Sequence, residues 1–189
     1  ANTEDNRRTW REMLFTTPEI SDYISGVILY DETIRQDASD GKPLREHLTD
    51  RGVIPGIKVD LSTNPLANSD GELITDGLDG LRARLDEYRE LGAKFTKWRA
   101  VITIGEDMPT NYCIAANSQA LARYAALAQE AGLVPIVEPE VLMDGSHSID
   151  TCFDVTEATL RRVFADLAEH EVRLEGIILK PNMVISATD

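Results

Sequence analysis

Short apolar runs alternate with helix-like runs along the whole chain, and this alternation constrains the fold more than any other feature of the sequence. The apolar runs are rich in Val, Ile and Leu without a clean apolar–polar alternation, which is typical of strands buried on both faces of a parallel sheet. Strand followed by helix, repeated, implies right-handed crossovers between parallel strands. We expect five strands, at residues 25–30, 55–60, 93–104, 133–142 and 174–180.

The segments between these strands have the apolar spacing of amphipathic helices. We expect an N-terminal helix capped by Thr3 and four more helices, within residues 43–52, 77–92, 116–132 and 154–172. Gly92 and Gly132 are expected to end two of them. Asp154, with Glu157 three residues later, resembles the capping box that begins a helix.

Two architectures accommodate this order of elements, an open doubly wound sheet and a (β/α)₈ barrel. A nucleotide-binding open sheet carries a Gly-rich turn, and neither GxGxxG nor GxxxxGK[ST] occurs in the chain. This favours the barrel, which needs eight strands and usually about 250 residues. We therefore predict an α/β protein in which residues 1–189 form a single, partial (β/α)₈ TIM-barrel domain of about five strands.

Composition excludes several classes of partner. The chain has 19 Lys plus Arg against 33 Asp plus Glu, a formal net charge of -14, so nucleic acid and anionic membranes, both polyanions, are not expected to bind. The three histidines form neither HxH nor HExxH, so no metal site is expected.

The two cysteines form no CxxC, and no signal-peptide core or membrane-length apolar run occurs, which predicts a cytoplasmic soluble protein.

Charged residues lie at the carboxyl ends of four expected strands, where functional groups gather in either architecture. They are Lys58, Lys97, Arg99, Glu138, Glu140 and Lys180. Side chains two residues apart on a strand share a face, so Lys97 points with Arg99, and Glu138 points with Glu140. Each alone is typical of a solvated strand end or a polar turn. Their recurrence on successive strands predicts one charged site.

This set of residues suits lysine-based covalent chemistry. A lysine is nucleophilic only when neutral, and burial or a neighbouring cation such as Lys97 favours the neutral form of Lys180. A neutral lysine attacks a ketone and, after loss of water, becomes an iminium that accepts electrons from an adjacent C–C bond. Glu138 suits the required proton shuttle. Lys58 and Arg99 suit the binding of an anion such as phosphate.

The same strand ends resemble class I fructose-1,6-bisphosphate aldolases. The resemblance rests on "GAKFTKWR", "VPIVEPE" and "LEGIILKPNMV", supported by "NTEDNRR", "GVILYDET", "GIKVD", "DGLDGLRARLDEY" and "LARYA", and runs from Asn2 to Val184. It implies reversible cleavage of fructose 1,6-bisphosphate, a phosphorylated sugar, to dihydroxyacetone phosphate and glyceraldehyde 3-phosphate, without metal or cofactor. The implied roles are Schiff-base lysine for Lys180, general acid/base for Glu138, assistance by Lys97, orientation of the lysines by Glu140, and binding of the phosphate remote from the ketone by Lys58 and Arg99.

The resemblance also implies a homotetramer, and it places parts of the family pattern outside these 189 residues. These parts are an earlier strand with a catalytic aspartate, two later strands that hold the ketone-side phosphate, and a C-terminal tyrosine tail. We therefore expect the chain to be a fragment. Two alternatives stay open: another Schiff-base aldolase on the same barrel, and a non-catalytic partial barrel that acts through protein contacts.

Overall fold

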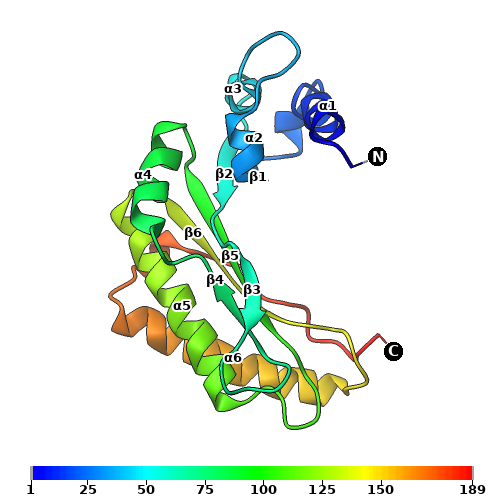
Figure 1. Cartoon of the computed structure of the whole chain (residues 1–189), viewed down its shortest axis with the longest axis vertical. Helices are drawn as coiled ribbons and strands as arrows, with labels where there is room; N and C mark the ends of the chain where they lie inside the picture. The colour runs from blue at the N-terminus through cyan, green and yellow to red at the C-terminus, as the bar shows by residue number, and fades with distance from the viewer. Residues whose placement is uncertain (1, 189) are drawn as a thin grey trace.

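The structure, a computed structural model, describes residues 2–188 and contains a five-stranded parallel sheet in the order β1-β2-β5-β6-β7 (Figure 1). The strands are β1 (Gly26–Leu29), β2 (Ile54–Lys58), β5 (Phe95–Ile102), β6 (Val134–Val141) and β7 (Ile178–Leu179). Each overlaps one of the five expected strands. The prediction of a parallel α/β sheet is confirmed.

The last strand is shorter than expected. Leu174–Gly176 form a 3₁₀ turn rather than the start of a strand, so β7 has only two residues. Its backbone pairing continues as far as the N–H of Lys180, which donates to the carbonyl of Val137 at 2.9 Å. The residue proposed as nucleophile therefore lies where the backbone ladder stops.

A second sheet has no counterpart among the expected elements. It is an antiparallel hairpin of β3 (Ser62–Pro65) and β4 (Leu73–Asp76), inserted between β2 and the next helix. The sequence of β3 is polar and mostly exposed, so it lacks the apolar run that would signal a strand. Thr75 of this hairpin donates to the carbonyl of Arg99 at 2.8 Å, which fastens the insertion to β5.

Six α-helices accompany the strands in the described residues. They are α1 (Glu4–Phe15), α2 (Asp31–Arg35), α3 (Leu44–Asp50), α4 (Leu81–Glu90), α5 (Asn111–Glu130) and α6 (Ile149–Glu169). Thr3 caps α1 as expected, by accepting the N–H of Asn6. The expected capping box at Asp154 is wrong, because α6 starts at Ile149 and Ser148 caps it by accepting the N–H of Thr151.

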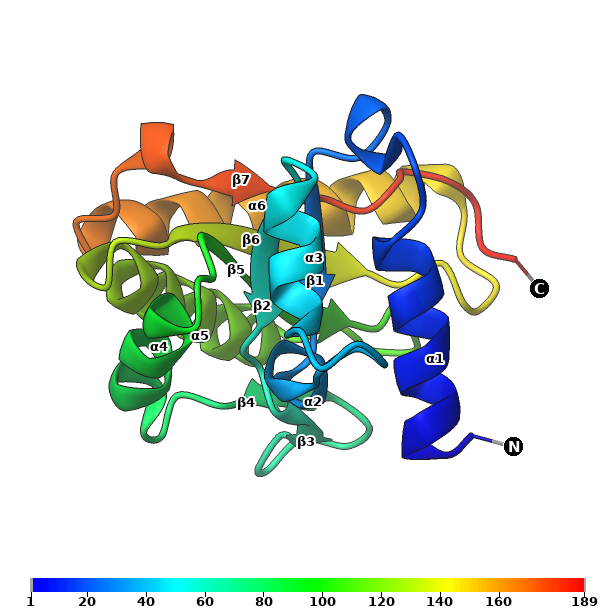
Figure 2. The ribbon, with the colours of Figure 1, turned by 90° about the horizontal axis from the view of Figure 1, so that it is seen from above.

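The helices pack against one side of the central strands. Figures 1 and 2 show α5 and α6 along β5 and β6, with α1, α2 and α3 grouped near β1 and β2. Trp98 of β5 stacks on Tyr124 of α5 with 5.4 Å between ring centroids, and both side chains are fully buried. No helix in residues 2–188 combines the length and apolarity needed to cross a membrane.

Burial alternates along β5, contrary to the expectation of a strand covered on both faces. Its even-numbered residues, including Trp98, are buried under the helices. Its odd-numbered residues, including Lys97 and Arg99, are partly exposed on the opposite face. This alternation places the expected pair of cations together on the face of the sheet that the helices leave open.

Candidate active site

A cleft of about 810 Å³ lies at the carboxyl ends of β2 and β5. Among the side chains that line it are Lys58, Asp60, Lys97 and Arg99, together with Tyr30 from the end of β1. The side chains reach the cleft because they occupy the last positions of parallel strands or the open face of β5. The expected gathering of charged residues at this end of the sheet is therefore observed for these strands.

Glu138 joins two of the predicted lysines. Its side chain lies on β6, is buried, and accepts a hydrogen bond from Lys180 Nζ through Oε1. Its other carboxylate oxygen, Oε2, lies 3.3 Å from Lys97 Nζ. A buried carboxylate without a charged partner is costly, and the two ammonium groups supply such partners to Glu138.

Asp60 is a second buried carboxylate of the site, and the sequence reasoning gave it no role. Its Oδ1 lies 2.5 Å from Lys58 Nζ, and its Oδ2 lies 3.9 Å from Lys97 Nζ. Oδ2 also accepts the backbone N–H of Arg99 at 3.3 Å. Lys97 thus lies between the two buried carboxylates Asp60 and Glu138. The sequence signal for Asp60 was its position two residues after Lys58, at the end of the same strand.

Glu140 does not have the contacts that the resemblance implied. Its carboxylate forms an ion pair with Arg99 Nε, and no contact with a lysine is recorded for it among the described residues. The hydrogen bond to Glu140 raises the pKa of Arg99 above its ordinary value, against the opposing effect of burial. The implied role of orienting the lysines therefore fits Asp60 better than Glu140, whose position suits the orientation of Arg99.

The expected burial of Lys180 is wrong for the described residues. The Lys180 side chain is 56% exposed, and its immediate neighbour is the carboxylate of Glu138 rather than the ammonium of Lys97. Among residues 2–188, β6 is the strand that pairs with β7 beside this lysine. The hydrogen bond to Glu138 gives the Lys180 ammonium a direct route for losing its proton.

Lys58 is held firmly at the mouth of the cleft. Its Nζ donates to the carbonyl of Asp60 at 2.9 Å and lies 5.9 Å from the centre of the Tyr30 ring. Two neighbouring carboxylates at the start of α2, Asp31 and Glu32, have different partners. Asp31 lines the cleft and accepts the hydroxyl of Tyr88 at 2.9 Å, whereas Glu32 pairs with arginines of α1.

Parallel strands whose carboxyl ends gather lysines and buried carboxylates place the chain in the α/β class of proteins. Residues 1–189 match the family model described as "Glycolytic: Fructose-bisphosphate aldolase class-I". The chain belongs to this family of lyases, and the resemblance noted in the sequence is confirmed.

Individual relatives agree. The chain is 67% identical over 185 residues to "Probable fructose-bisphosphate aldolase class 1" of Xanthomonas axonopodis pv. citri (strain 306). This match covers 98% of this chain and 55% of the relative. It is 54% identical over 188 residues to "Fructose-bisphosphate aldolase 5, cytosolic" of Arabidopsis thaliana, covering 100% of this chain and 52% of the relative. The chain thus spans about half the length of the curated relatives it matches.

A solved structure supports the fold. The aldolase of Plasmodium falciparum, determined in complex with TRAP and a small-molecule inhibitor, superposes with a TM-score of 0.98 at 45% identity. The match covers 100% of this chain and 55% of the other. The prediction of a partial TIM barrel is confirmed, and the five-stranded sheet described above is the part of the barrel that this chain contributes.

Proposed function

We propose that this chain carries the Schiff-base centre of a class I fructose-bisphosphate aldolase, which reversibly cleaves fructose 1,6-bisphosphate to dihydroxyacetone phosphate and glyceraldehyde 3-phosphate. The observation that carries the proposal is the hydrogen bond from Lys180 Nζ to Glu138 Oε1, with Lys97 on the other oxygen of the same carboxylate. It supplies a nucleophile, a proton shuttle and a compensating cation in direct contact.

Imine formation follows from this arrangement. Lys180 passes a proton to Glu138, and the neutral amine attacks the ketone carbon of the open-chain sugar to give a carbinolamine. Protonated Glu138 then returns the proton to the carbinolamine hydroxyl, which leaves as water, so that an iminium remains on Lys180 and Glu138 is again a carboxylate.

The iminium drives C–C cleavage. Glu138, ionised again, takes the proton of the hydroxyl on C4, and the C3–C4 bonding electrons move toward the iminium nitrogen. Glyceraldehyde 3-phosphate leaves as the aldehyde, and an enamine remains on Lys180. Glu138 returns this proton to the enamine carbon, and addition of water then releases dihydroxyacetone phosphate and regenerates the lysine. Lys97 lies between Glu138 and Asp60, so its positive charge compensates these carboxylates while the proton moves.

The remaining cations suit the phosphate remote from the ketone. Lys58 on β2 and Arg99 on β5 line the same cleft, and β6 separates these strands from Lys180 on β7. Arg99 pairs with Glu140 through Nε, and its guanidinium offers further donors in a planar fork that matches phosphate oxygens. In this proposal Asp60 positions Lys58 and Lys97, and Glu140 positions Arg99.

The proposal extends to the assembly and to the cellular location of the protein. We infer a cytoplasmic enzyme, in line with the Arabidopsis relative that is named cytosolic, and a homotetramer by resemblance to the family. Light scattering of the full-length protein measures the assembly directly. A monomer would remove the tetramer from the proposal without affecting the chemistry at Lys180.

Borohydride trapping tests the chemistry. The full-length protein is incubated with dihydroxyacetone phosphate and sodium borohydride, digested, and mapped by mass spectrometry. We expect a reduced adduct on Lys180 and none in Lys180→Arg, which keeps the positive charge. An unmodified Lys180 in an active, folded protein would refute the assignment. Trapping with other keto substrates distinguishes a fructose-bisphosphate aldolase from another Schiff-base aldolase on the same barrel.

A further inference from the structure

The nucleophile of the proposed reaction is attached to a very short strand. β7 has two residues, which pair with Ile136 and Val137 of β6. The ladder between β7 and β6 ends with the N–H of Lys180, which donates to the carbonyl of Val137. The backbone on the far side of Lys180 therefore needs another attachment if the lysine is to keep a defined position relative to Glu138.

Asn182 provides that attachment through its side-chain amide. Its Oδ1 accepts the backbone N–H of Val141 at 3.2 Å, so the side chain takes the place of a strand partner on β6. Its Nδ2 donates to Thr156 Oγ1 on α6 at 3.1 Å and to the carbonyl of Met183 at 3.0 Å. One side chain thus ties the segment after Lys180 to both β6 and α6.

The anchor and the catalytic pair share one reference element. Glu138 and Val141 both belong to β6, so a bond to Val141 fixes the segment after Lys180 to the strand that carries its carboxylate partner. The role requires an amide, because only an amide combines an acceptor oxygen with a two-hydrogen donor nitrogen. We propose that Asn182 is a positioning residue that holds Lys180 at the distance from Glu138 required for proton transfer. This inference rests on the proposed aldolase function.

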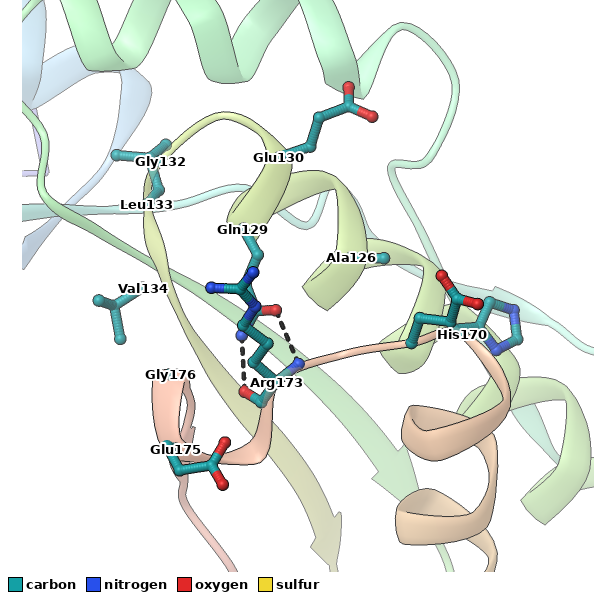
Figure 3. Close-up of a pocket in the computed structure, with 11 residues that line it drawn as sticks. Ala126, Gln129, Glu130, Gly132, Leu133, Val134, His170, Arg173, Glu175 and Gly176 are labelled. Carbon is teal, nitrogen blue, oxygen red and sulfur yellow. Dashed lines mark hydrogen bonds between the residues drawn. The ribbon is translucent and has the colours of Figure 1, made fainter.

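The opposite end of the segment offers a matched comparison. In the pocket shown in Figure 3, Gln129 of α5 donates to the carbonyl of Arg173 at 2.8 Å and accepts its N–H at 2.9 Å. Gln129 and Asn182 are therefore both amides that bind main-chain groups flanking β7. Gln129 binds the backbone on the N-terminal side of β7, so the strand lies between this contact and Lys180. Asn182 lies on the C-terminal side, two residues after the lysine.

The experiment measures imine formation in Asn182→Ala and Gln129→Ala of the full-length protein, by borohydride trapping with dihydroxyacetone phosphate at short times. Misplacing a reacting group by about 1 Å costs up to about 100-fold in rate, so we expect Asn182→Ala to slow trapping and kcat by about 10- to 100-fold. KM for fructose 1,6-bisphosphate is expected to change by less than about twofold, because Lys58 and Arg99 lie on other strands. Gln129→Ala is expected to lower Tm without slowing trapping.

A second pair of variants keeps the test decisive if Asn182→Ala does not fold. Thr156 and Thr159 are both buried on α6, and Thr159 Oγ1 has no hydrogen-bond partner among the described residues. Thr156→Val removes the acceptor of Asn182 and is expected to slow trapping by about threefold to tenfold, the size of one lost hydrogen bond. Thr159→Val is expected to match the parent protein.

Three results would overturn the proposal: trapping in Asn182→Ala as fast as in the parent, equal slowing in Gln129→Ala at equal loss of Tm, or identical rates in the two threonine variants. A parent protein that forms no adduct at all refutes the aldolase function instead. The trapping of the parent therefore separates failure of the function from failure of the positioning role.

Discussion

Lys180 and Glu138 meet across the two last strands of the sheet, with the lysine at the end of β7 and the carboxylate buried on β6. The contact joins an ammonium that is more than half exposed to a carboxylate that is almost fully covered. Within residues 2–188, Glu138 is therefore the buried member of the pair and Lys180 is the member that solvent reaches.

Glu138→Gln should leave the lysine in place and remove its proton shuttle. We expect the rate of imine formation to fall by about 10²- to 10⁴-fold, the usual contribution of general acid–base catalysis. Rapid-quench borohydride trapping measures this rate. Glu140→Gln is the control on the same strand face, because Glu140 pairs with Arg99 and is expected to change KM instead. Equal slowing of trapping in both variants would contradict the assignment.

Asp60→Asn should show that Asp60 is the carboxylate that holds two lysines. Asp60 is buried and contacts Lys58 and Lys97, so its removal leaves two ammonium groups without this partner. Breaking a buried ion pair on one side costs about 3–5 kcal/mol, and we expect a loss of this order in the free energy of unfolding measured in urea. Asp50→Asn, which breaks an exposed pair with Lys42, should change the free energy of unfolding much less than Asp60→Asn does. Similar losses in the two variants would count against a central role for Asp60.

Arg99→Lys should weaken the binding of the phosphate remote from the ketone. Lysine keeps the charge but loses the planar fork, so we expect KM for fructose 1,6-bisphosphate to rise about tenfold, with kcat changed little. Fructose 1-phosphate lacks this phosphate and serves as the control substrate, whose KM should stay within about twofold. A parallel rise for both substrates would place Arg99 elsewhere in the mechanism.

The stability of the hairpin attachment should depend on pH through Glu72. Burial alone would raise the pKa of Glu72, but hydrogen bonds from Ser69 and Thr110 outweigh it and hold the pKa below its ordinary value of 4.5. The contacts from the backbone N–H and the hydroxyl of Thr110, the cap of α5, are both 2.6 Å long. They join the β3–β4 hairpin to the start of α5.

A carboxylate whose pKa is lowered by folding stabilises the protein above its unfolded pKa, and this stabilisation is lost as the pH falls through the folded value. We expect Glu72→Gln to be less stable by about 1–3 kcal/mol near pH 7, with the difference shrinking as the pH falls below about 4.5. Urea unfolding of both proteins across this range measures it. A difference that stays constant with pH would show that the charge of Glu72 does not contribute.

The sequence by itself determined the order of strands and helices along the chain and the end of the sheet at which the charged residues gather. Both depend on local pattern: apolar runs mark buried strands, and the two-residue period of a strand places Lys97 beside Arg99 on one face. The motifs that resemble the aldolase family lie in these same strand segments. The hairpin was missed because β3 is polar and mostly exposed and β4 has only four residues. The start of α6 was missed because the spacing of Asp154 and Glu157 resembled a capping box further along the same helix.

Only the tertiary structure decided which charges meet. Arg99 and Glu138 are direct neighbours in the register of β5 and β6, yet Glu138 pairs with Lys97 and Lys180, and Arg99 turns to Glu140. Asp60 likewise contacts both Lys58 and Lys97. Long charged side chains reach across several positions of a sheet, so their partners depend on strand register, burial and neighbouring backbone donors, none of which is encoded in the spacing of residues along one strand.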